Sequence, residues 1–149
     1  HAMDIMRMES GFLHWGHDIS PEENQYQAGL KFAISYKKNI NFVGKEALLK
    51  IKDQNPTKSL AMMVLKDNRP GEPLLLHEEP IYLDDKIIGR TTSGNYSFNF
   101  KKNISFGYVN SGNSIEDLIN KNLSIEVEKK KYPVTIIKKP LNQKNIKNI

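Results

Sequence analysis

The second part of this sequence is a series of short strand-like runs, and this series most constrains the fold. The runs are rich in β-branched and aromatic residues and are separated by residues typical of turns. They are SLAMMVL (59–65), PIYL (80–83), KIIGRTTS (86–93), NISFGYV (103–109), NLSIEVE (122–128) and YPVTIIKK (132–139). About six strands in roughly eighty residues are typical of a small β-barrel or β-sandwich.

The connections between these runs also carry turn and cap signals. The dipeptide at 84–85 and the lysines at 129–131 each predict a compact hairpin turn. A brief helix, IEDLINK, is predicted to be capped by Ser114 with Asp117. Residues 142–149 are polar without periodicity, which predicts a disordered tail.

The first part of the chain begins with a predicted helix over residues 3–10. Ile5, Met8 and Phe12 recur at helical spacing on one face, and Gly11 is a typical residue just past a last turn. No capping residue precedes this helix. We therefore expect that the chain was cut from a longer protein at this point.

The next segment, up to the first strand-like run, carries mixed signals. A second helix is predicted to begin at Ser20, with a proline at its first position and Glu23 reaching back to the cap, and to end at Gly29. The alternation in FAISY (32–36) predicts a half-buried strand. A further helix with one apolar face follows and is predicted to end at residues 55–56, Asn-Pro.

These patterns divide the chain into two folded parts. Residues 1–2 are interpreted as a remnant of an expression tag. Residues 3–55 carry too few elements to close a core alone and are expected to be the end of a mixed α/β unit. Residues 56–141 are expected to form an all-β module, and 142–149 the polar tail.

Composition excludes several classes of site. The chain of 149 residues has no cysteine, so disulfides and thiolate chemistry are excluded. No run approaches the length of a membrane span and no secretory signal is visible, so we expect a cytoplasmic protein without membrane contact. The net charge of +5 comes largely from scattered lysines, with only three arginines, and no recognised motif accompanies it. Specific nucleic-acid binding is therefore not expected.

Most of the chemically active side chains lie in RMESGFLHWGHDIS (7–20). His14, His17 and Asp18 are metal-ligand types, but Gly16 interrupts the helix that would bring two imidazoles together at this spacing. We predict no metal site. No Gly-x-Ser-x-Gly elbow, phosphate-binding loop or dinucleotide fingerprint is present, so we expect no nucleophilic serine and no nucleotide-binding loop of these types.

Arg7 and Trp15 are the remaining candidates in this segment. Arg7 lies in an apolar helical stretch, where an unpaired charge is costly, so it requires a carboxylate partner. Glu9, Asp18 and an acidic ligand are the alternatives. Trp15 offers a flat ring face suited to packing another ring. From these residues alone, an internal ion pair is slightly favoured over a ligand site.

The order of several short motifs resembles the aminomethyltransferase family, which includes the glycine cleavage T-protein. These motifs are R-x-E-x-G-F, HWGHDI, SPEEN, AGL and FVGKEAL, followed by TTSGNYSFNFKKNISFGYV in the strand-rich part. The HWGHDISPE form is most similar to the folate-binding C-terminal part of dimethylglycine and sarcosine dehydrogenases. The resemblance extends collinearly over about residues 3–141.

The resemblance implies an α+β fold: the end of a mixed α/β folate-binding domain followed by a small six-stranded antiparallel β-barrel. It implies tetrahydrofolate as the ligand, which captures a one-carbon unit as 5,10-methylene-tetrahydrofolate. The family's key Asp would lie upstream of this chain, so the resemblance implies no catalytic residue within it, and an FAD domain would also lie upstream if the parent is a dehydrogenase. The upstream domains of the same polypeptide are then the expected partners, and the fragment alone is expected to be inactive. Arg7, Glu9 and Trp15 are the expected folate-binding residues.

Three other functions remain open at this stage. The chain could be a fragment of a glycine cleavage T-protein, although such proteins usually have Tyr where this chain has Trp15. It could be a non-catalytic folate-binding module acting in RNA modification or cluster repair. A basic structural or nucleic-acid-binding protein is the third alternative.

Overall fold

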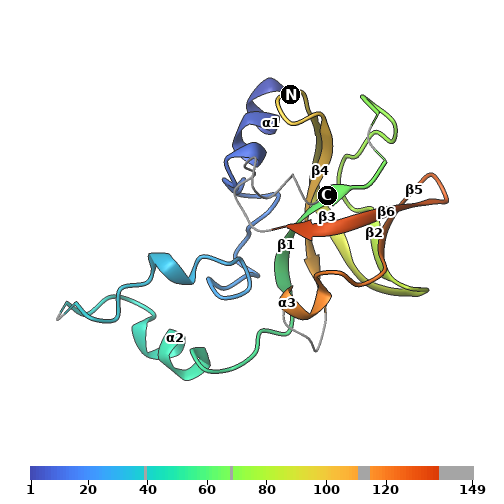
Figure 1. The fold of residues 1–149 in the computed structure, drawn as a ribbon. Helices are drawn as coiled ribbons and strands as arrows, with labels where there is room; N and C mark the ends of the chain where they lie inside the picture. The colour runs from blue at the N-terminus through green and yellow to red at the C-terminus, as the bar shows by residue number, and fades with distance from the viewer. Residues whose placement is uncertain (39, 68, 111–114, 138–149) are drawn as a thin grey trace.

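The strand-rich part folds into a closed six-stranded antiparallel barrel, as seen in a computed structural model that describes residues 1–38, 40–67, 69–110 and 115–137 (Figure 1). The strand order is β1-β4-β3-β2-β5-β6, and β6 pairs with β1 to close the barrel. The strands are β1 (Ser59–Leu65), β2 (Pro80–Leu83), β3 (Lys86–Ser97), β4 (Lys102–Val109), β5 (Leu123–Val127) and β6 (Lys130–Ile137). The predicted barrel is confirmed.

Strand β1 is buried on both of its faces, which accounts for its nearly continuous apolar sequence. Ala61, Met63 and Leu65 belong to the core cluster that draws on the other strands as well. Leu60, Met62 and Val64 alternate with them and form a second cluster with Met8 of α1 (Ala2–Glu9). Helix α1 therefore packs on the outside of the barrel and is joined to it by a shared apolar core.

Helix α1 confirms the first predicted helix, with one difference on its apolar face. Met8 is buried and Ile5 packs beside it, whereas Phe12 is largely exposed. The helix begins at Ala2, inside the residues interpreted as a tag remnant, and Ile5 N donates to the carbonyl of His1. No helix of the described residues has the length and apolarity needed to cross a membrane.

The predicted helix over 20–29 is wrong, because nearby side-chain oxygens accept hydrogen bonds from backbone amides of this segment. Ser20 Oγ accepts from the Glu22 amide, and Glu23 accepts from the Ser20 amide, so the cap forms without a helix behind it. Asn24 Oδ1 then accepts from the amides of Tyr26 and Gln27. Such side-chain bonds compete directly with helical ones, and the segment consists of turns.

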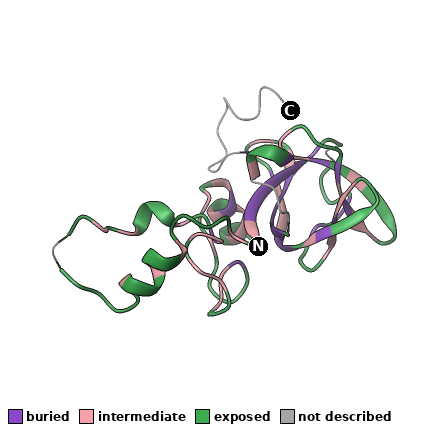
Figure 2. Ribbon diagram, turned by 90° about the horizontal axis from the view of Figure 1, so that it is seen from below, coloured by how far each residue is buried: buried purple, intermediate pink, exposed green. Residues whose placement is uncertain are grey.

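Residues 24–38 and 40–57 form an arm that is bonded to β1 through the Gln27 carbonyl and otherwise extends away from the barrel (Figure 1 and Figure 2). The predicted strand at 32–36 is wrong: a 3₁₀ turn, η1 (Lys31–Ala33), lies there instead, and no strand pairs with it among the described residues. The predicted helix before Pro56 exists as α2 (Lys45–Ile51) but ends earlier than expected. Within the described part of the arm, Ala28 is the single buried residue, so the arm has almost no core of its own.

Two sequence predictions lie outside the described residues. These are the cap at Ser114 and the polar tail at 142–149. The helix that Ser114 was expected to cap is described as α3 (Ile115–Leu118), and its Leu118 packs into the barrel core.

Candidate functional site

The candidate site is built around the carboxylate of Asp18, which is fully buried between α1, the loop after it and β3. Its Oδ2 accepts from Arg7 Nη1 at 2.6 Å and from the His14 amide at 2.9 Å. Its Oδ1 accepts from Thr92 Oγ1 at 2.6 Å and from Ser93 Oγ at 2.8 Å. We call these five residues the Asp18 cluster. A buried carboxylate with one cation and three further donors is fully compensated.

A β-bulge in β3 makes this arrangement possible. In a regular strand, consecutive side chains point to opposite faces, so Thr92 and Ser93 would not reach the same carboxylate. The pairing of β3 with β4 shifts register between Thr91 and Ser93, and both hydroxyls then reach Oδ1 of Asp18. The bulge is the feature that gives the barrel wall a pair of adjacent donors.

Arg7 is held on several sides by protein groups. Besides Asp18, its Nε donates to Asp4 Oδ1 at 3.0 Å and its Nη2 donates to Ser93 Oγ at 3.0 Å. Nη1 also approaches the Phe12 carbonyl at 3.3 Å. The hydrogen bond from Arg7 holds the pKa of Asp4 below its ordinary value. Of the carboxylate partners that the sequence left open for Arg7, the structure brings Asp18 to it. Among the described residues, one N–H on Nη2 of Arg7 has no hydrogen-bond partner.

Glu9 and Trp15 lie apart from the Arg7 ion pair. Glu9 accepts from Ser97 Oγ and, at 2.7 Å, from Asn99 Nδ2, so it ties the end of α1 to the turn between β3 and β4. The Trp15 side chain is 67% exposed. Its loop is closed by a bond from the Gly16 amide to the Ile19 carbonyl at 2.7 Å. The loop is thus fixed while the indole ring stays accessible.

The structure adds a third imidazole that the sequence gave no reason to place here. His14 and His17 stack with ring centroids 4.5 Å apart, and His77, from the connection between β1 and β2, lies edge-on to His17 at 6.4 Å. Spacing along the chain could not reveal this approach. Among the described residues, no three metal-binding side chains converge in an arrangement that could hold an ion.

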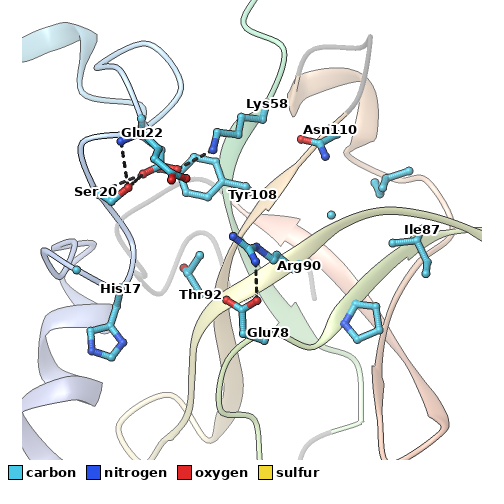
Figure 3. Close-up of a pocket in the computed structure, with 15 residues that line it drawn as sticks. His17, Ser20, Glu22, Lys58, Glu78, Ile87, Arg90, Thr92, Tyr108 and Asn110 are labelled. Atoms are coloured by element: carbon cyan, nitrogen blue, oxygen red, sulfur yellow. Dashed lines mark hydrogen bonds and ion pairs between the residues drawn. The ribbon is translucent and has the colours of Figure 1, made fainter.

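A polar cleft of about 660 Å³ lies beside the Asp18 cluster (Figure 3). Two ion pairs line it, Lys58 Nζ to Glu23 Oε1 at 2.6 Å and Arg90 Nη1 to Glu78 Oε2 at 2.7 Å. Burial raises the pKa of Glu23, but hydrogen bonds from Lys58 and Ser20 more than offset it and hold the pKa below its ordinary value. With charges of both signs, the cleft suits a polar ligand.

Tyr108 connects this cleft with the Asp18 cluster. Its hydroxyl donates to the backbone carbonyl of Asp18 at 2.9 Å, and the Lys58 ammonium lies 5.0 Å from its ring centre. Burial raises the pKa of Tyr108 well above its ordinary value, so the hydroxyl stays protonated and remains a donor. The loop carrying Asp18 is therefore attached to the barrel through both its side chain and its backbone.

The barrel matches the family model described as the glycine cleavage T-protein C-terminal barrel domain, over residues 58–142. Residues 1–38 match the N-terminal domain model of the same protein group. The chain therefore belongs to the glycine cleavage T-protein, or aminomethyltransferase, family. The resemblance found in the sequence is confirmed.

Individual relatives include both enzymes and a solved structure. The chain is 31% identical over 94% of its length to 4-methylaminobutanoate oxidase (formaldehyde-forming) of Paenarthrobacter nicotinovorans. It is 32% identical over 95% of its length to mitochondrial dimethylglycine dehydrogenase of Mus musculus. In both cases it spans 16% of the relative.

The crystal structure of the glycine cleavage system aminomethyltransferase T from Bartonella henselae shares the fold. Its TM-score is 0.79 at 22% identity, and the match covers 93% of this chain and 37% of that one. The matched region extends beyond the barrel, because the match covers 93% of the chain and the barrel strands make up much less than that.

Proposed function

We propose that this chain is the C-terminal part of a tetrahydrofolate-dependent one-carbon transfer enzyme, similar to dimethylglycine and sarcosine dehydrogenases. In this proposal, folate captures the one-carbon unit as 5,10-methylene-tetrahydrofolate. The observation that carries the proposal is the 32% identity over 95% of the chain to dimethylglycine dehydrogenase, which includes the segment with the Asp18 cluster and Trp15 as well as the barrel.

The upstream part of the same polypeptide is proposed to complete the site. Residues 3–55 would form the end of the α/β folate-binding domain, and residues 56–141 the barrel domain. The arm supports this division, because side chains such as Phe32, Ile40 and Val43 are exposed and have no core to cover them. The catalytic acid and, in a dehydrogenase, FAD would be supplied upstream, so this chain alone would be inactive.

Trp15 is proposed to pack against the flat ring system of the folate. The support is its exposed ring on a loop whose backbone is fixed, an arrangement that offers a large contact area with little loss of backbone freedom. Arg7 would contribute its one remaining N–H donor, and Glu9 a carboxylate oxygen beside the β3–β4 turn. In this proposal Arg7 acts mainly by shaping the site.

A glycine cleavage T-protein fragment is the second candidate, favoured by the structural likeness to the Bartonella henselae protein. The two candidates differ upstream. A flavin-binding βαβ motif ahead of this segment would favour the dehydrogenase, whereas a T-protein half without one would favour the transferase. A non-catalytic folate module remains the third candidate, distinguished by folate binding without turnover in the longer protein.

The proposal is tested by titrating 5-formyltetrahydrofolate, a stable reduced folate, into this chain. Trp15 is the single tryptophan, so its fluorescence reports on this site alone. We expect weak, saturable quenching, because only part of the pocket is present. Arg69→Ala, in the exposed connection between β1 and β2, is the control and should titrate like the wild type. Quenching that only follows the absorbance of the added folate would refute folate binding here.

A further inference from the structure

We infer that Asp18 is the positioning residue of this site: its buried carboxylate sets the place of both the Arg7 guanidinium and the Trp15 loop on the barrel. The inference rests on the proposed function only for the identity of the ligand that the positioned groups would meet. Asp18 itself is fully buried, so it acts through its neighbours and is not itself a ligand contact.

Asp18 joins parts of the chain that are far apart in sequence. Arg7 comes from α1, the His14 amide from the loop, and Thr92 and Ser93 from β3, more than seventy positions away. Removal of the carboxylate would leave these donors without their common acceptor. Leaving buried donors without an acceptor is costly, so the loop would lose its side-chain attachment to α1 and β3 and keep the bond from Tyr108 to the Asp18 backbone carbonyl.

The two carboxylate oxygens have different kinds of partner, which allows charge and geometry to be separated. Oδ2 faces two obligatory donors, Arg7 Nη1 and the His14 amide. Oδ1 faces the hydroxyls of Thr92 and Ser93, which can accept as well as donate. In Asp18→Asn, the amide oxygen can therefore take the place of Oδ2 while the NH₂ group donates to the hydroxyls. Asp18→Ala offers no such replacement.

The experiment measures the near-ultraviolet circular dichroism of Trp15 at a temperature well below unfolding, with far-ultraviolet spectra confirming that each variant is folded. We expect Asp18→Ala to lose most of the tryptophan band and Asp18→Asn to retain it. Asp85→Ala, a fully exposed aspartate in a hairpin, should leave the band unchanged. A residue with a purely stabilising role would lower the unfolding temperature and leave the band of the folded state intact.

Thr92→Val serves if Asp18→Ala does not fold. It removes one donor to Oδ1 and keeps the shape of the side chain, and we expect a partial loss of the tryptophan band. A full wild-type band in Thr92→Val, or in folded Asp18→Ala, would overturn the inference. So would an equal loss in Asp18→Asn and Asp18→Ala.

A folate titration of the same variants separates this inference from the proposed function. Wild type and Asp18→Asn should show similar quenching of Trp15 by 5-formyltetrahydrofolate, and Asp18→Ala should show less. If the wild type shows no saturable quenching, folate binding by this chain is refuted. The tryptophan band without ligand still decides whether Asp18 positions the loop.

Discussion

Arg7→Ala should destabilise the protein far more than an ordinary surface substitution. Among the described residues, Arg7 is the one cation on the Asp18 carboxylate, which is fully buried and would be left with three neutral donors. Breaking a buried ion pair from one side costs about 3–5 kcal/mol. Since the Arg7 side chain keeps 17% exposure and the three other donors remain, we expect the lower end, about 3 kcal/mol.

Urea unfolding at neutral pH, followed by far-ultraviolet circular dichroism, measures this free energy. For a chain of this size, about 3 kcal/mol corresponds to a fall in melting temperature of roughly 6–12 °C. Arg69→Ala is the matched control, because the Arg69–Glu72 pair is exposed and such pairs contribute about 0–1 kcal/mol.

A double-mutant cycle identifies the source of the loss. Asp18→Asn removes the negative charge, so its cost should be much smaller in the Arg7→Ala background than in the wild type. If Arg7→Ala costs no more than Arg69→Ala, or if the two changes at Arg7 and Asp18 simply add, the assignment of this ion pair as a buried, compensated unit is refuted.

Three further changes test the barrel and the cleft. Gly94→Ala should destabilise by about 1–3 kcal/mol, because its Cβ would lie 2.4 Å from Leu75 Cβ, and a urea midpoint near the wild type would contradict this. Phe106→Ala, at a fully buried site, should cost about 3–5 kcal/mol in the same assay, and a cost below about 1 kcal/mol would contradict the packing. Glu23→Gln should lower the melting temperature at neutral pH, where Glu23 is ionised and bonded to Lys58. Because the folded pKa of Glu23 lies below its ordinary value of 4.5, this difference should shrink as the pH falls below about 4.5, and a difference independent of pH would count against the pair.

The barrel was predictable from sequence because its signals are local. Each strand carries its own apolar run, and the turns lie at residues 84–85, as predicted, and at 128–129, one residue before the predicted start at 129. The arm was not predictable in the same way. Ser20, just before the arm, and Asn24, within it, are residue types that often cap helices. Here their side chains accept hydrogen bonds from backbone amides in turns, and only the surrounding chain decides between a helix and a turn.

The site was predictable only in part. The sequence shows that Arg7 needs a carboxylate, and physical reasoning favoured an internal partner, which the structure provides in Asp18. The hydroxyls of Thr92 and Ser93 could not be foreseen, since their joint approach depends on a bulge in β3 and on the closure of the barrel. The folate-binding roles of Arg7, Glu9 and Trp15 remain predictions.

Closure of the barrel also determines where aggregation of this protein can begin. Each strand that the structure describes has a neighbour on both sides, so the described barrel has no open sheet edge to recruit another chain. Non-specific aggregation should then start at the exposed apolar side chains of the arm, such as Phe32 and Val43. Polar replacements there should improve solubility and leave the unfolding of the barrel unchanged.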